Sequence, residues 1–143
     1  MIYVDTSALV ALIVREPGSA AVAAWYTAAK SELVSAAWCV TEFGSALGLK
    51  QRTGQLDAAQ ARAAWERFER LVANDVRLLL VETADFHRAA MLTLDAASGV
   101  RAGDALHLAC AERAGARELV TLDAVMAKNA RQLRLKPVAL KPF

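Results

Sequence analysis

The chain has 143 residues and a formal net charge of +2, from 17 basic and 15 acidic residues. Its 56% of hydrophobic residues argues against an intrinsically disordered chain and suffices for the core of a single domain, residues 1–143. The longest apolar runs, such as residues 8–14, are far shorter than the roughly 20 residues of a membrane span, and the start lacks a secretory leader. We therefore expect a cytoplasmic protein with no membrane partner.

Short apolar segments alternate with helical segments along the chain. In chain order, strands are expected at residues 1–5, 32–36, 76–81, 118–123 and 137–140. Helices are expected at residues 7–14, 19–30, 38–50, 57–72, 83–97, 104–114 and 124–133. This alternation predicts an α/β sandwich around a mainly parallel sheet, with a helical hairpin inserted between the second and third strands.

Two acidic residues stand at the ends of predicted strands. Asp5 closes the first strand and Asp123 closes the fourth. In open α/β sheets, sites form beyond the carboxyl ends of the strands, near a switch in strand order. If the first and fourth strands are neighbours, the two carboxylates face each other across that crevice. Taken alone, each acid is explained as well by capping the helix that follows it.

Two further acids lie in apolar surroundings. Glu42 is the only charge in the helical stretch 36–49, and Asp104 begins the predicted helix DALHLACA. A buried carboxylate is costly unless it is paired or binds a cation, although exposure of Glu42 and helix capping by Asp104 are the simpler alternatives. A cluster of several carboxylates requires neutralisation, and hard oxygen ligands select Mg²⁺ or Mn²⁺. Such ions promote phosphodiester hydrolysis.

Other residue types give weaker indications of function. Cys39 and Cys110 lack the spacing of a zinc site and are expected to be buried free thiols. Five aromatic residues lie at helical positions and are expected in the core or an interface rather than on an RNA-stacking platform: Trp25, Tyr26, Trp38, Phe43 and Trp65.

Four pieces of the chain resemble the PIN-domain ribonucleases, in particular the VapC toxins of bacterial VapBC toxin–antitoxin pairs. They are IYVDTSALVAL at the N-terminus, TEFGSAL, RAGDALHLACA, and LVTLD followed by a helix. Their order and the size of the chain extend the resemblance over nearly its whole length. It implies a PIN-like α/β/α sandwich with a five-stranded sheet in the order 3-2-1-4-5.

The resemblance also implies an activity. The implied activity is that of a Mg²⁺- or Mn²⁺-dependent endoribonuclease, a toxin that cleaves transfer or ribosomal RNA. The resemblance also implies a VapB-like antitoxin that binds the toxin, and a homodimer of the toxin itself. Thr6 and Thr121 fall on supporting hydroxyl positions, whereas we interpret His107 as a packed, hydrogen-bonded scaffold residue. The family's catalytic acids fall on Asp5, Glu42, Asp104 and Asp123, with Asp5, Asp104 and Asp123 as metal ligands.

Three basic residues are candidates for RNA contacts. Arg101 comes just before Asp104, and Lys128 and Arg131 belong to the acid-free segment 124–143, which also contains Lys141. A basic surface attracts phosphates, although arginine and lysine at the end of a helix are equally common for structural reasons.

Several alternative functions remain open. A solitary PIN nuclease of RNA processing and a catalytically silent PIN-like binding module fit the same motifs. A haloacid-dehalogenase-type phosphatase needs a second aspartate where this chain has Ser7. A receiver domain needs paired acids after the first strand, and an aspartate after the third strand, where this chain has Glu82. The phosphatase and the receiver domain are therefore the weaker alternatives.

Overall fold

The computed structural model describes residues 1–140 and shows a five-stranded sheet in the order β3-β2-β1-β4-β5, with every neighbouring pair parallel. Lys141 lies outside the described residues. The strand order expected from the resemblance is confirmed. The short fifth strand lies at the edge of the sheet, as expected for a segment that contains Pro137. The strands are β1 (Ile2–Val4), β2 (Leu33–Ala36), β3 (Val76–Leu79), β4 (Glu118–Val120) and β5 (Lys136–Pro137).

The helices agree with the predicted ones apart from shifts at their ends. They are α1 (Thr6–Ile13), α2 (Ser19–Ala28), α3 (Trp38–Arg52), α4 (Ala58–Asn74), α5 (Thr83–Leu94), α6 (Ala102–Ala114) and α7 (Ala124–Gln132), with a 3₁₀ turn at Ala96–Ser98. The α3–α4 hairpin lies between β2 and β3, and Asp57 and Gln60 form the predicted capping box of α4.

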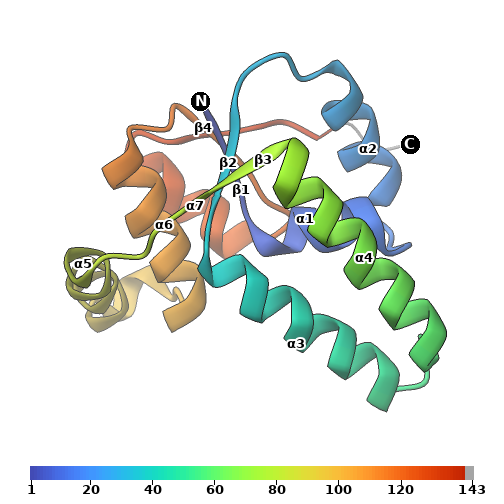
Figure 1. The fold of residues 1–143 in the computed structure, drawn as a ribbon. Coiled ribbons are helices and arrows are strands. Elements are labelled where there is room, and N and C mark those ends of the chain that lie inside the picture. Colours follow the sequence, from blue (N-terminus) through green and yellow to red (C-terminus); the bar gives the residue numbers. More distant parts are fainter. Residues whose placement is uncertain (141–143) are drawn as a thin grey trace.

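Helices cover both faces of the sheet, which explains why its strands are apolar without alternation (Figure 1). Ile2 and Val4 of β1 face a core formed with α1 to α4, whereas Tyr3 between them faces α6 and α7 on the other side. This two-residue period is the ordinary alternation of side chains along a strand. Each face therefore has a hydrophobic core of its own.

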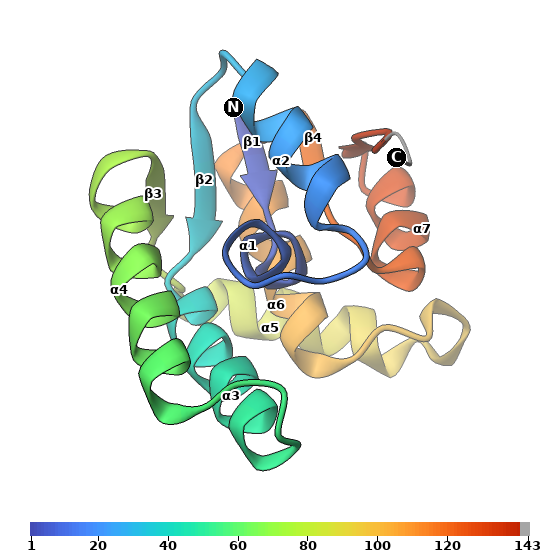
Figure 2. The same ribbon diagram turned by 90° about the vertical axis from the view of Figure 1, so that its right-hand side faces the viewer.

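The carboxyl ends of the strands meet at one edge of the sheet. Figure 2 shows the arrowheads of β1 and β2 pointing toward this edge, where α1 and α3 begin. The same edge receives the start of α7, which follows β4. The topology therefore collects several helix N-termini in one region of the molecule. Within residues 1–140, no helix has the length and apolar character needed to cross a membrane.

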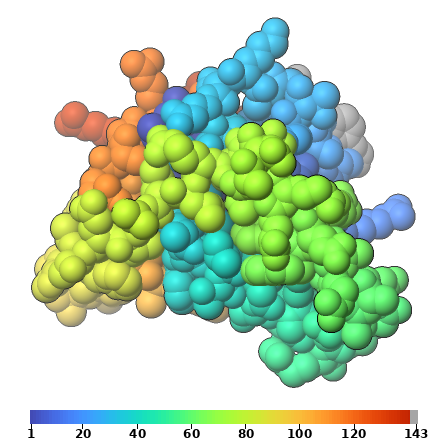
Figure 3. All heavy atoms as spheres, in the orientation of Figure 1, coloured from blue at the N-terminus to red at the C-terminus, as the bar shows by residue number. Residues whose placement is uncertain are grey.

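Helix α5 carries a row of uncovered apolar side chains. Phe86, Met91 and Leu94 are 54%, 56% and 75% exposed, and α5 forms the lower left of the surface in Figure 3. Met91 and Leu94, three residues apart, are neighbours on one side of the helix, and Phe86 lies further round it. We call these three residues the α5 apolar row.

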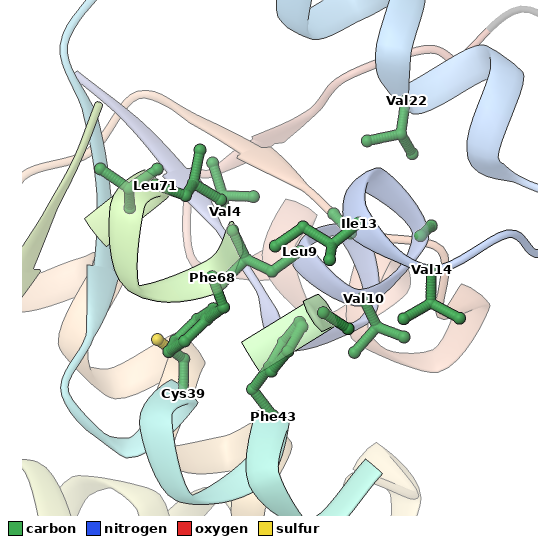
Figure 4. Close-up of a cluster of buried hydrophobic side chains, with 14 of the residues drawn as sticks. Val4, Leu9, Val10, Ile13, Val14, Val22, Cys39, Phe43, Phe68 and Leu71 are labelled. Carbon is green, nitrogen blue, oxygen red and sulfur yellow. The ribbon is translucent and has the colours of Figure 1, made fainter. Parts of the chain in front are cut away.

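Aromatic packing joins the α3–α4 hairpin to the rest of the first core. Phe43 of α3 and Phe68 of α4 stack with ring centroids 4.3 Å apart, next to Leu9 of α1 (Figure 4). Trp65 lies against both rings, and Trp25 and Tyr26 pack on the same core from α2. Trp38 packs on the second core. The expectation that these aromatic residues are structural is confirmed.

Candidate active site

The sheet brings the first and the last of the four acids to neighbouring strands. Asp5 directly follows β1, and its backbone N–H donates to the carbonyl oxygen of Val120 in β4, 3.1 Å away. Asp123 follows β4 after a two-residue loop and is the N-cap of α7. The first and fourth strands are therefore neighbours, as expected, although Asp123 belongs to the loop and not to the strand.

Asp5 is almost completely buried and uses both carboxylate oxygens as hydrogen-bond acceptors. Its exposed fraction is 2%. Oδ1 accepts from the hydroxyl of Ser7 at 2.7 Å and from the backbone N–H of Ala8 at 3.0 Å, and Oδ2 accepts from the hydroxyl of Thr121 at 2.5 Å. Burial raises the pKa of Asp5 above its usual value, and the hydrogen bonds from Thr121, Ala8 and Ser7 offset only part of that rise.

The two hydroxyls that hold Asp5 also hold the loop that carries Asp123. Ser7 Oγ accepts from the N–H of Leu122, and Thr121 Oγ1 accepts from the N–H of Asp123, both at 3.0 Å. Each hydroxyl therefore bridges Asp5 to the β4–α7 loop. Thr121 was expected to support the site, whereas Ser7 was missed, because a serine two residues after a capping aspartate looks like an ordinary start of a helix.

Glu42 is not on an exposed polar stripe of α3. Its side chain is 24% exposed, and Oε1 accepts from the hydroxyl of Thr6 at 2.6 Å and from His107 Nε2. Burial opposes its charge, but the hydrogen bonds from His107 and then from Thr6 lower the pKa of Glu42 below its usual value. His107 is packed and hydrogen-bonded, as its interpretation as a scaffold residue expects.

Asp104 differs from the other three acids because its side-chain carboxylate has no hydrogen-bonding partner within residues 1–140. It is half-buried in the first turn of α6, which begins at Ala102 with Arg101 as its N-cap. The prediction that Asp104 starts and caps this helix is therefore wrong, because Ala102 and Gly103 extend the helix toward the N-terminus. Burial, with the charges of Asp123 and Asp5, raises the pKa of Asp104 to about 6.

The donor set suits a hard divalent cation, because the four acids offer carboxylate oxygens and Asp104 has no proton donor to neutralise it. The charges of Asp123, Asp5 and Glu42 all raise the pKa of Asp104, as expected for carboxylates near one another. Across the described part of the chain, no three Asp, Glu, His or Cys side chains already stand in a metal-holding arrangement. The chemistry and charge of these residues therefore fit a divalent cation, while the cage itself is not preformed.

The candidate RNA-binding residues are divided between two places. Arg101 is exposed at the start of α6, three residues before Asp104. Lys128 and Arg131 are exposed on α7, with Arg131 in its last turn, at the end opposite to Asp123. Of the three, Arg101 alone lies at the same helix start as one of the acids.

The two cysteines take no part in the acidic site. Both are buried free thiols, as predicted. Burial raises the pKa of Cys39 to about 11 and that of Cys110 to about 12, so neither ionises near neutral pH. Neither cysteine therefore offers a thiolate at neutral pH.

Comparisons with known proteins agree with this architecture. The chain is similar to the sarcin-ricin-loop-cleaving toxin VapC20 of Mycobacterium tuberculosis, with 16% identity over 90% of this chain and 95% of that chain and a TM-score of 0.72. It is also similar to FitAcB of Neisseria gonorrhoeae, with 19% identity over 97% of each chain and a TM-score of 0.71. For VapBC2 of Rickettsia felis bound to a promoter DNA fragment, the identity is 15% over 96% of this chain and 98% of that chain, and the TM-score is 0.66.

These structural similarities establish the fold, and sequence comparison adds the family. No curated protein matches the chain in sequence. The family model of the PIN domain matches residues 2–132, a span that includes Asp5, Glu42, Asp104 and Asp123. Because this match covers nearly the whole chain, the protein belongs to the PIN-domain family.

Proposed function

We propose that the protein is a Mg²⁺- or Mn²⁺-dependent endoribonuclease and the toxin of a VapBC-type pair in the cytoplasm. The observation that carries the proposal is Asp104, a half-buried carboxylate with a pKa raised to about 6 and no partner in the described chain. Such a group next to Asp5 and Asp123 calls for a cation. The RNA-cleaving activity named for VapC20 supports RNA as the substrate class.

Each residue of the site has a proposed role. Asp5, Asp104 and Asp123 hold the cation, and Glu42 completes the acidic site while it is held by Thr6. Thr121 keeps Asp5 in place. When bound, the cation supplies positive charge to the scissile phosphodiester and favours ionisation of the attacking water.

Cleavage of a labelled RNA by the purified chain tests this proposal. We expect cleavage with Mg²⁺ or Mn²⁺, none in excess EDTA, and a loss of about 100-fold or more in Asp104→Asn, since this carboxylate has no substitute. Glu66→Gln is the matched control, because Glu66 is an exposed acid on α4 without an ion pair among the described residues. Equal cleavage in EDTA, or by both variants, would contradict the proposal.

Basic side chains would bind the RNA on either side of the cut. We assign this role to Arg101, Lys128 and Arg131, because all three are exposed and none has an ion pair within residues 1–140. Replacing any one of them by alanine should remove about one phosphate contact. The slope of the logarithm of RNA affinity against the logarithm of salt concentration should then become shallower by about one. An unchanged slope would remove that residue from the interface.

We propose that an antitoxin segment binds between α1, α2 and α4. An open hollow of about 300 Å³ there is lined by Leu12, Tyr26 and Leu71, with Arg67 and Arg70 beside them. We expect a VapB-like partner to place apolar side chains in it and acidic ones against the arginines. Co-expression of a short reading frame found next to the gene should restore growth to cells that express the wild type, and the absence of such a frame or a failure of rescue would favour a solitary nuclease.

The α5 apolar row supports the proposed homodimer. These three large apolar side chains stay exposed although α5 itself packs on α6, and exposed apolar side chains of this size are typical of an interface. Phe86→Asp should convert a dimer to a monomer in light scattering without lowering the unfolding temperature of the monomer. A wild type that is monomeric at high concentration would exclude this dimer.

A further inference from the structure

A continuous line of hydrogen bonds leads from the backbone of β2 to the carboxylate of Glu42. The N–H of Ala36 donates to Tyr3 Oη at 3.0 Å, and Tyr3 Oη lies 2.6 Å from His107 Nδ1. On the other side of the ring, His107 Nε2 bonds to Glu42 Oε1. Tyr3 and His107 are 0% and 1% exposed, so solvent does not compete for these contacts.

The direction of each proton in this line follows from the donors that are available. Glu42 Oε1 belongs to a carboxylate and only accepts, so the single ring proton of a neutral His107 lies on Nε2. Nδ1 is then an acceptor for the hydroxyl proton of Tyr3, whose oxygen in turn accepts the N–H of Ala36. Tyr3 and Glu42 together select this tautomer of the histidine.

The two oxygens of Glu42 become different as a result. Oε1 accepts from both His107 and Thr6, whereas Oε2 is directed to the first turn of α6, where a Cβ on Gly103 would lie 2.9 Å from it. Gly103 is the residue before Asp104. Anchoring Oε1 therefore points Oε2 toward the helix start that carries the unpartnered acid.

We infer that His107, oriented by Tyr3, is a positioning residue that fixes the Glu42 carboxylate in the acidic site. The inference rests on the proposed nuclease function for its effect on rate, and on the hydrogen bonds alone for its structural part. His107 acts through Glu42 rather than on the substrate, because both ring nitrogens are engaged and the ring is buried. A histidine that only fills space would not need a donor at Nε2.

Three variants separate positioning from packing. His107→Leu removes the donor, His107→Gln keeps an N–H donor near the place of Nε2, and Tyr3→Phe removes the hydroxyl that selects the tautomer. Leu108→Val is the matched control, since Leu108 is the next residue of α6 and is also buried. Thermal unfolding identifies the variants that fold.

We expect His107→Leu to lower kcat for RNA cleavage by about 10- to 100-fold, as for other residues that orient a ligand of a metal site, with KM for RNA little changed. His107→Gln should recover about tenfold of that loss, and Leu108→Val should cleave as the wild type does. A folded His107→Leu with wild-type kcat, or a His107→Gln no better than His107→Leu, would overturn the inference.

Two measurements need no activity. Long-range ¹H–¹⁵N spectra should show His107 of the wild type protonated at Nε2 and bare at Nδ1, with exposed His87, the other histidine, as the internal reference. Tyr3→Phe should lose this single tautomer. A proton on Nδ1 in the wild type would overturn the inference.

A crystal structure of His107→Leu gives the second measurement. The Glu42 carboxylate should leave its wild-type position, and a carboxylate that stays there would overturn the inference. A wild type that cleaves no RNA with either metal would instead refute the proposed function, and the tautomer and the carboxylate position would still decide the role of His107.

Discussion

At the scale of single residues, Gly103 provides space rather than conformational freedom. It lies inside α6, and its backbone is not in the left-handed region. A Cβ at this position would lie 2.9 Å from Glu42 Oε2 and 3.2 Å from Trp38 Nε1, a buried N–H with no hydrogen-bond partner in the described chain. Both distances are shorter than ordinary contacts, so a side chain here must displace the Glu42 carboxylate.

Gly103→Ala should therefore separate stability from activity. Alanine in place of a glycine inside a helix stabilises it by about 0.5–1 kcal/mol, so the unfolding temperature should be maintained or rise. RNA cleavage should fall by about tenfold or more, because the displaced carboxylate loses its contacts with His107 and Thr6. Gly44→Ala in α3 is the control, since its Cβ would meet only Trp65, at 3.9 Å. Equal cleavage by the two variants would contradict this reasoning.

At the scale of elements, two of the four acids are helix caps. Asp5 caps α1 by accepting from the N–H of Ala8, and Asp123 caps α7 by accepting from the N–H of Met126 at 2.8 Å. The capping interpretation and the active-site interpretation of these residues are therefore compatible. A cap fixes the side chain at the strand–helix junction, which is also where a ligand at the sheet edge would be bound.

Substitutions of Asp123 distinguish these two roles. Asp123→Asn keeps a good cap and Asp123→Ala does not, while both remove the same charge. The alanine variant should be less stable than the asparagine variant by about 1 kcal/mol, or roughly 4 °C in unfolding temperature. Both should lose RNA cleavage. Equal stability of the two variants would show that the cap contributes nothing.

At the scale of the whole molecule, the acidic site lowers the stability of the metal-free chain. The pKa of Asp104 is about 6 in the folded state and near 4 in an unfolded chain, so the folded state binds more protons between these values. Stability from this group therefore falls as the pH rises from about 4 to 6. At pH 7 in EDTA, Asp104→Asn should be more stable than the wild type by about 1 kcal/mol, allowing for the partial exposure of Asp104.

Chemical denaturation at pH 4 and pH 7 checks this difference, which should vanish at the lower pH. Mn²⁺ should reverse the order at pH 7, because a ligand at 100 times its Kd adds about 2.7 kcal/mol to the wild type only. A wild type that is more stable than Asp104→Asn in EDTA would contradict the repulsion argument.

The fold was largely predictable because its signals are local. Apolar runs, caps and breaks identify the strands and helices, and the alternation of the two predicts a parallel sheet. The pairing of β1 with β4 is non-local, so the strand order came from the resemblance alone. The four acids could be found at strand ends and in apolar stretches, whereas the bridges through Ser7 and the line through Tyr3 and His107 could not. Those contacts join side chains that only the finished fold brings together.

The pairing of β1 with β4 also has a consequence in time. The ribosome makes Asp5 well before Asp123, so the two acids come together only after β4 has been synthesised. Until then, β1 lacks its central neighbour, and Asp5 lacks the hydroxyl of Thr121. The acidic site that we propose for RNA cleavage is therefore incomplete in a nascent chain until β4 and the loop after it have been made.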